Sequence, residues 1–204
     1  MIRNVIFDLG NVLINFRPSE YLDKKEYSKE VKAIILSDIF NAKEWFQLDN
    51  GDITIPEAIE SIAERSSLTK EEIARIFDLR TDIMVPIDQN VILLPELKKR
   101  GYRLYFLSNF PIDIFQTIRS DNDFFNYFDG GLISAEVRYS KPDKKIYEIL
   151  LEKYALKANE CLFIDDLEVN VRAAEATGME GLVTYGSEKI SDSINDFLSL
   201  RLMH

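Results

Sequence analysis

Several short apolar runs in this chain end in side chains that could take part in chemistry. Three runs, "VIF", "YRLYFL" and "CLFI", are strongly apolar, and a fourth, "GGLIS", is weaker. The polar residues that end or follow these runs are Asp8, Ser108, Asn109, Lys141, Asp165 and Asp166. If the runs are parallel strands, their carboxyl ends meet at one edge of a sheet, where ligands of open α/β folds bind. We therefore expect these side chains to converge on one site.

The residue types suit the transfer of a phosphoryl group. A carboxylate can attack phosphorus and form an aspartyl phosphate, which splits one difficult displacement into two easier steps. Because the carboxylate and the phosphate are both anionic, a cation must lie between them, and Mg²⁺ prefers carboxylate and phosphate oxygens. We expect the metal ligands to be Asp8, Asp165, Asp166 and the backbone carbonyl of Gly10.

Ser108, Asn109 and Lys141 are expected to bind the remaining phosphate oxygens. Lys141 would also be catalytic together with Asp8, because an ammonium group can neutralise the charge that develops during phosphoryl transfer. The net charge of the chain is −10. An anionic substrate would therefore depend on such a local cation or on a bound metal.

Each of these residues also has an interpretation without function. Asp8 could turn the chain, Ser108 could cap the next helix, and Lys141 could be a solvated surface residue. Asp165 and Asp166 would suit the N-terminus of a helix, although adjacent carboxylates repel each other. The functional interpretation depends on the whole set lying at one edge of one sheet.

Apolar runs alternate with helical patterns over most of the chain, which predicts an α/β fold. The stretches "QNVILLPELKKRG", "KPDKKIYEILLEKYAL" and "EVNVRAAEATG" have helical spacing, and the first and third end at Gly101 and Gly178. The first apolar run lies in "NVIFD", and one further strand is expected at "GLVTYG". Continuous apolar strands between helices indicate a Rossmann-like parallel sheet with helices on both faces.

Residues 18–87 interrupt this alternation with helical patterns and no convincing strand. Thr54 or Ile55, followed by Pro56, and the pair "LT" before "KEEI" are typical helix starts. We predict an α/β core of residues 1–17 and 88–204 and an all-helical cap of residues 18–87, inserted after the first strand. Such a cap can close over the site and set the choice of substrate.

The adjacent aromatic residues Trp45 and Phe46 are the most prominent side chains of the predicted cap. They could contact substrate. Aromatic residues at helical spacing are more often part of a helical core, so we expect both side chains to be buried in the cap.

Composition excludes several classes of function. The acidic net charge argues against nucleic acid or an anionic membrane as the main partner, so a small molecule is expected. The single histidine is the last residue, so a Ser-His-Asp or Cys-His mechanism has no base. A zinc site of histidines and cysteines has too few ligands. The dinucleotide and P-loop glycine motifs are absent.

The expected location is the cytoplasm. The chain has one cysteine, Cys161, and therefore no intrachain disulfide, which favours a reducing compartment. The N-terminus has no signal-peptide pattern, and no apolar stretch is long enough to span a membrane. The sequence does not indicate an oligomeric state.

The order Asp8, Ser108, Lys141, Asp165-Asp166 resembles the four motifs of the haloacid dehalogenase (HAD) superfamily. The resemblance covers essentially the whole chain, including a helical cap after the first strand. It implies that Asp8 is the nucleophile and that Asp166 binds Mg²⁺ directly. Asp165 would bind the metal or a metal-bound water, and Ser108 and Lys141 would hold the phosphate.

One position departs from the pattern of phosphatases in this superfamily. They usually have a second aspartate two residues after the nucleophile, which protonates the leaving group and then activates water. Here this position is Gly10, and Asn11 cannot act as an acid. The string "FDLGNVL" is similar to bacterial sugar-phosphate phosphatases that share this glycine, which implies a hexose 1-phosphate as a substrate. Without the acid, rates should depend steeply on leaving-group pKa.

Two other functions remain open. A 2-haloacid dehalogenase of the same superfamily needs no leaving-group acid, but it also needs no Mg²⁺, and the pair Asp165-Asp166 suits a metal. A catalytically weak or inactive phosphosugar-binding protein would explain Gly10 as well. Assays of turnover on phosphate esters and of halide release in a chelator separate these functions.

Overall fold

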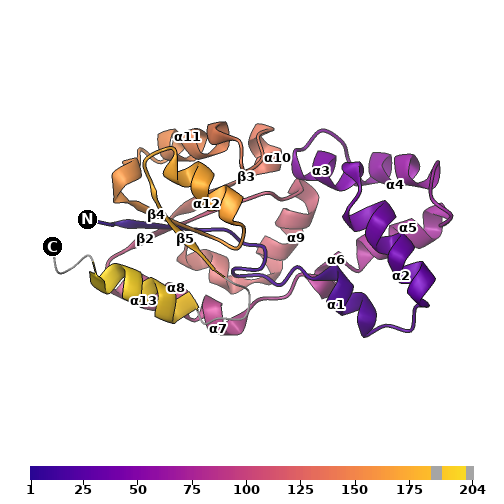
Figure 1. The fold of residues 1–204 in the computed structure, drawn as a ribbon, viewed down its shortest axis with the longest axis horizontal. Helices are drawn as coiled ribbons and strands as arrows, with labels where there is room; N and C mark the ends of the chain where they lie inside the picture. The colour runs from indigo at the N-terminus through magenta and orange to yellow at the C-terminus, as the bar shows by residue number, and fades with distance from the viewer. Residues whose placement is uncertain (185–189, 201–204) are drawn as a thin grey trace.

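A parallel sheet of five strands forms the centre of the larger lobe (Figure 1). Its strands are β1 (Asn4–Phe7), β2 (Arg103–Ser108), β3 (Gly130–Ile133), β4 (Cys161–Asp165) and β5 (Glu180–Val183). The spatial order is β3-β2-β1-β4-β5, and every neighbouring pair is parallel. Strand β1 therefore lies in the middle, between β2 and β4. The computed structural model describes residues 1–184 and 190–200 of the chain.

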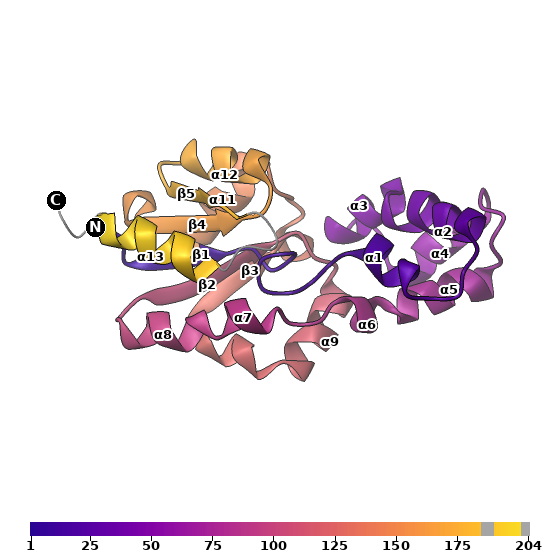
Figure 2. The same ribbon diagram turned by 60° about the horizontal axis from the view of Figure 1, so that its bottom comes forward.

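Helices cover both faces of the sheet, as the continuous apolar strands predict (Figures 1 and 2). One face packs on α8 (Leu93–Lys99), α9 (Ile112–Asp121) and α13 (Ile190–Leu200). The other packs on α11 (Lys144–Lys153) and α12 (Glu168–Glu175). Short helices α7 (Asp88–Val91) and α10 (Ser134–Val137), with 3₁₀ turns at Asp123–Tyr127 and Ala158–Glu160, complete the connections.

The second lobe is all-helical and follows β1 in the chain (Figure 2). It contains α1 (Pro18–Asp23), α2 (Lys29–Ile35), a π-helical turn (Leu36–Phe40), α3 (Lys43–Asp49), α4 (Ile55–Ala63), α5 (Lys70–Asp78) and α6 (Arg80–Ile83). The predicted fold class, a Rossmann-like parallel core with a helical insert after the first strand, is confirmed. We call this lobe the cap.

Two cap helices begin where their sequences indicate. Thr54 accepts a hydrogen bond from the backbone N–H of Glu57, and the Glu57 carboxylate accepts one from the backbone N–H of Thr54 at 2.7 Å. Thr69 and Glu72 form the same reciprocal capping box before α5. Each box satisfies two backbone donors that a helix start leaves without partners.

The two adjacent aromatic residues of the cap have different environments. Trp45 is buried and stacks on Phe16 and Phe77, with ring centroids 5.4 and 6.0 Å apart. Phe46 is 67% exposed. The expectation that both belong to the cap core is therefore wrong for Phe46, because consecutive residues of a helix point about 100° apart and only one of them faces the core.

Two sequence predictions extend beyond the described residues. The last predicted strand, "GLVTYG", reaches residues 185 and 186, and the terminal His204 is also outside the described ranges. Within those ranges, none of the helices combines the length and the apolar character that crossing a membrane requires.

Candidate active site

The three central strands bring the predicted site residues together. Asp8 follows β1, Ser108 ends β2 and Asp165 ends β4, and β1 pairs with both neighbours. The backbone N–H of Asp8 continues the ladder by donating to the carbonyl of Ile164 at 2.8 Å. The side chains of Asp8, Ser108 and Asp165 are all buried. The sheet thus fixes their backbones from both sides.

Lys141 joins this group from the segment between α10 and α11. Its ammonium nitrogen lies 2.8 Å from Oδ1 of Asp8 and 2.6 Å from Oδ2 of Asp165. The side chain is 98% buried, so these ion pairs are shielded from water. A lysine that sequence alone could leave on the surface is therefore the positive centre of the site.

Asn109 holds the backbone of Lys141 in place. Its amide group donates to the carbonyl of Lys141 at 2.9 Å and accepts from the N–H of Lys141 at 2.8 Å. This reciprocal pair gives Asn109 a positioning role that the sequence analysis did not foresee. Direct contact of Asn109 with phosphate stays a prediction.

Asp165 is held by a second network. Asn170, in the first turn of α12, donates to both carboxylate oxygens at 3.0 and 3.1 Å, and the N–H of Leu167 donates to Oδ1 at 2.9 Å. The hydroxyl of Tyr147 donates to the carbonyl of Asn170 at 2.9 Å. Together with Lys141, these contacts fix the Asp165 carboxylate in one orientation.

Asp166 has fewer protein contacts than its neighbour. Asn11 donates to its Oδ2 at 3.2 Å, and the side chain is half-buried. Asn11 has a left-handed backbone, with φ at 54°, and its own amide oxygen accepts from the N–H of Phe16 at 3.1 Å. The loop after β1 is thereby tied to the loop after β4.

The charges of the site are unbalanced. Burial raises the pKa of Asp8 to about 7, and the charge of Asp165 adds to this effect while Lys141 opposes it. Burial and Asp165 also raise the pKa of Asp166. Burial disfavours the ammonium form of Lys141, but Asp8 and Asp165 outweigh it and raise its pKa. Three carboxylates share one ammonium group, which leaves negative charge to be compensated.

The same three carboxylates could hold a metal ion. Asp8, Asp165 and Asp166 each offer one oxygen, and these oxygens lie within 4.8 Å of one another. An all-oxygen site with an excess of negative charge suits a hard divalent cation such as Mg²⁺. The residues present therefore fit the metal that the sequence predicts.

Gly10 leaves open space beside Asp8. A β-carbon built there meets no atom closer than Oδ2 of Asp8, at 3.9 Å, apart from its chain neighbours. Neither crowding nor a left-handed backbone requires glycine at this position. The backbone at position 10 therefore has room for a side chain.

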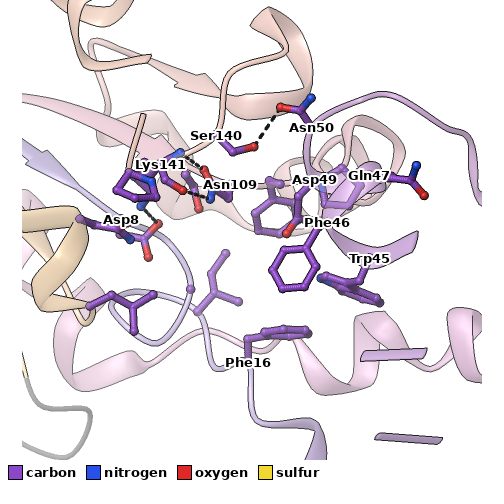
Figure 3. A pocket seen from close by; sticks show the side chains of 18 of the residues that line it. Asp8, Phe16, Trp45, Phe46, Gln47, Asp49, Asn50, Asn109, Ser140 and Lys141 are labelled. Atoms are coloured by element: carbon purple, nitrogen blue, oxygen red, sulfur yellow. Dashed lines mark hydrogen bonds and ion pairs between the residues drawn. The ribbon is translucent and has the colours of Figure 1, made fainter. Parts of the chain in front are cut away.

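A cavity of about 610 Å³ lies above these residues, between the core and the cap (Figure 3). Asp8, Ser108, Asn109 and Lys141 line its polar end. The apolar lining consists of Ile14, Phe16, Trp45, Phe46, Met84, Phe110, Pro111, Pro142, Leu167 and Val169. Figure 3 shows Phe16, Trp45 and Phe46 gathered on the cap side. The cavity thus joins a charged floor to apolar walls.

The end of α3 brings further polar residues from the cap into this lining. They are Gln47, Asp49, Asn50 and Asp52. Sequence reasoning assigned none of them a role, because α3 reads as an ordinary amphipathic helix and nothing in its pattern indicates which turn faces the core. Only the placement of the cap brings Asp49 and Asp8 to opposite sides of one cavity (Figure 3).

Comparisons with known proteins identify the family. The sequence pattern of one protein family, the haloacid dehalogenase-like hydrolases, matches residues 2–178 of this chain. The chain is also 32% identical over 196 residues to the sesquiterpene phosphatase astK of Aspergillus oryzae, covering 96% of this chain and 93% of that protein. The chain therefore belongs to the haloacid dehalogenase-like hydrolases, as the resemblance of its four motifs implied.

Solved structures of this fold agree. The HAD family enzyme bt-2542 of Bacteroides thetaiotaomicron is 25% identical and superposes with a TM-score of 0.74, covering 95% of this chain and 98% of that one. The same enzyme has been crystallised with magnesium and inorganic phosphate. A HAD-like hydrolase of Porphyromonas gingivalis, 24% identical, has a TM-score of 0.77, and the match covers 97% and 98% of the two chains.

Proposed function

We propose that this hydrolase is a Mg²⁺-dependent phosphatase that removes phosphate from the monoester of an apolar alcohol, through an aspartyl phosphate on Asp8. The observation that carries the proposal is the cavity itself. Its floor presents a carboxylate and an ammonium group, and its walls are mostly apolar. A phosphate group suits the floor and an apolar leaving group suits the walls.

Asp8 is the nucleophile in this proposal, because its carboxylate lines the cavity and follows the central strand. Lys141 and Ser108 bind the phosphate oxygens and neutralise the charge that builds up on them. Asp165, held by Asn170, keeps Lys141 in position. When bound by Asp8, Asp165, Asp166 and the Gly10 carbonyl, Mg²⁺ would compensate the negative charge of the site and polarise the phosphate.

The apolar walls and the relative from Aspergillus oryzae support the same class of leaving group. That relative is named a sesquiterpene phosphatase and is similar over nearly the whole chain. On the cap side, Asn50 is already partnered, since it donates to Asp52 at 2.8 Å and accepts from Ser140 at 3.1 Å. Asn50 and Asp52 therefore have fewer free groups for the hydroxyls of a sugar.

A hexose 1-phosphate is the second candidate, because the opening "FDLGNVL" resembles sugar-phosphate phosphatases. The test compares phosphate release from a terpenyl phosphate and from a hexose 1-phosphate, with Mg²⁺ and with a chelator. We expect kcat/KM to be at least about 10-fold higher for the terpenyl phosphate, since burying an apolar group contributes about 1.5–3 kcal/mol. A preference for the hexose ester would reverse the assignment of substrate.

The same assay separates the remaining alternatives. Binding of both esters without turnover would indicate an inactive phosphosugar-binding protein. Release of halide from a 2-haloacid in the presence of chelator would indicate a dehalogenase. The proposed enzyme acts on a small molecule, and the cytoplasm stays its expected location.

A further inference from the structure

We propose that Asp49, at the end of cap helix α3, is the general acid and general base of this phosphatase. It would supply from the cap the proton transfers for which the chain has no carboxylate at position 10. The inference rests on the proposed function, and its test is arranged so that the two can fail separately.

Asp49 is the carboxylate best placed for this role. In the part of the chain that the structure describes, the carboxylate residues that line the cavity are Asp8, Asp49 and Asp52. Asp8 is the proposed nucleophile. Asp52 is exposed and accepts a hydrogen bond from Asn50. Asp49 is half-buried and lies across the cavity from Asp8 (Figure 3).

The core holds this part of the cap in place through backbone and side-chain contacts. The hydroxyl of Ser134 donates to the carbonyl of Asp49, and the hydroxyl of Ser140 donates to Asn50 at 3.1 Å. Gly51 has a left-handed backbone, with φ at 72°, and it packs closely against the backbone of Ala135. A β-carbon at position 51 would lie only 2.8 Å from the carbonyl oxygen of Ala135. The backbone of Asp49 is therefore held against the core directly, and the contacts of Asn50 and Gly51 hold it further.

The Asp49 carboxylate is left available for a substrate. Among the described residues, we find no hydrogen bond or ion pair that ties it down. Burial raises its pKa to about 7, with a further increase from Asp8 and an opposing effect of Lys141. A carboxyl group that changes its charge near neutral pH can both donate and accept a proton during turnover.

Other nearby groups are less suited. The Lys141 ammonium is held by two carboxylates, at 2.6 and 2.8 Å. The amide of Asn11 is engaged by Asp166 and by Phe16, and an amide is no proton donor of this kind. Asp8 and Asp49 line the same cavity, so a leaving oxygen at Asp8 can be approached from the cap.

The two chemical steps balance as follows. In the first, an oxygen of Asp8 bonds to phosphorus, the phosphorus–oxygen bond of the ester breaks, and the departing oxygen takes the proton of Asp49. In the second, a water oxygen bonds to phosphorus and gives a proton to the Asp49 carboxylate. The bond between phosphorus and Asp8 breaks, and its electron pair returns to Asp8. The products are an alcohol and inorganic phosphate.

The test measures kcat/KM for a series of phosphate esters, from p-nitrophenyl phosphate to simple alkyl phosphates, in wild type and Asp49→Asn. Loss of a general acid should lower kcat/KM about 10²–10⁴-fold for alkyl esters and far less for p-nitrophenyl phosphate. The wild type should therefore show a shallow dependence on leaving-group pKa and the variant a steep one. The shallow dependence expected for the wild type differs from the sequence prediction. With glycine at position 10 and no other acid, the rates of the wild type would depend steeply on leaving-group pKa.

A single-turnover measurement separates this inference from the proposed function. With p-nitrophenyl phosphate, Asp49→Asn should release one equivalent of p-nitrophenolate rapidly and then turn over slowly, because water is no longer activated. Asp8→Asn should show no burst and no turnover. If Asp8→Asn retains turnover, the proposed function fails, whatever Asp49 does.

Two further variants give controls. Asp38→Asn removes a half-buried cap carboxylate that does not line the cavity, and it should leave the leaving-group dependence unchanged. Gly10→Asp in the Asp49→Asn background should restore the shallow dependence, because the backbone has room for a side chain. Asp49→Ala serves if the asparagine variant does not fold.

Two results would overturn the proposal. One is an equal loss of kcat/KM for all esters in Asp49→Asn. The other is a steep dependence of kcat/KM on leaving-group pKa already in the wild type.

Discussion

The core and the cap position their proposed catalytic groups in different ways. In the α/β core, these groups lie at the ends of strands or, like Lys141, form ion pairs with residues there. In the cap, Asp49 and Phe46 lie in the last turn of one helix, α3. Asp8, Ser108 and Asp165 belong to three adjacent strands whose backbones are hydrogen-bonded to each other. Asp49 and Phe46 reach the same cavity only because the end of α3 docks on Ser134 and Ser140. In the proposed mechanism, the core therefore supplies the phosphate chemistry, and the cap supplies the environment of the leaving group.

The largest effect is expected when the proposed nucleophile of the core is removed. Asp8→Asn should lose essentially all phosphatase turnover, because an amide does not form the aspartyl phosphate. The protein should stay folded, since the substitution keeps the shape of a side chain at the cavity surface. Rates of phosphate release and a thermal melt check both points. A purified variant that keeps more than about a tenth of the rate contradicts the covalent mechanism.

A second variant tests the metal-binding role of the core. Asp166→Ala should raise the Mg²⁺ concentration needed for half-maximal activity by at least about 10-fold. Its effect on stability should be small, because removing one carboxylate relieves repulsion from Asp165. The measurement is a Mg²⁺ titration of activity beside an unfolding curve.

The metal assignment has its own control. A chelator should abolish the activity of the wild type, and added Mg²⁺ should restore it. Unchanged activity in the chelator would remove the metal from the mechanism.

Phe46 tests the contribution of the cap to specificity. Phe46→Ala should raise KM for an apolar phosphate ester about 10-fold, because the ring lines the apolar wall of the cavity. Inhibition by inorganic phosphate should not change, since phosphate binds at the core. The control is Tyr27→Ala, which removes an exposed cap aromatic residue that does not line the cavity. Equal effects of the two variants would mean that Phe46 is an ordinary surface residue.

The smallest expected effect concerns the stability of the cap. Glu44 is fully buried, and it accepts hydrogen bonds from Ser61 at 2.8 Å and from Arg65 at 2.7 Å. Burial opposes the ionised form of Glu44, but these hydrogen bonds outweigh it and lower the pKa of Glu44. Glu44→Gln should reduce the free energy of unfolding by about 1–2 kcal/mol at neutral pH, since Arg65 is partly exposed.

This stabilisation should depend on pH in a defined direction. A carboxyl group whose pKa is lowered by folding stabilises the protein above its unfolded pKa, and the contribution is lost as pH falls through the folded value. The difference between wild type and Glu44→Gln in urea unfolding should therefore shrink on acidification below the ordinary glutamate pKa of 4.5. Glu64→Gln, at an exposed cap position, should have little effect at either pH. If the difference in stability between wild type and Glu44→Gln grew in acid, the stabilising role of the ionised Glu44 would be contradicted.

Most of the core can be predicted from the local pattern of the sequence. Apolar runs of four to eight residues between helical patterns indicate buried parallel strands, and five strands lie where such runs were predicted. The candidate residues converge because the carboxyl ends of parallel strands share one edge of the sheet. The helix starts at Thr54 and Thr69 were readable for an equally local reason, since a capping box lies within four residues.

What the cap contributes to the cavity depends on contacts that local pattern does not show. The order of the strands, the ion pairs of Lys141 and the position of Asp49 depend on contacts between residues far apart in the chain. Local pattern does not encode which turn of a helix docks on another lobe, because an amphipathic helix satisfies its periodicity in many placements. The sequence therefore revealed that an acid is missing at Gly10. Only the docking of α3 on the core showed which carboxylate lies across the cavity from Asp8.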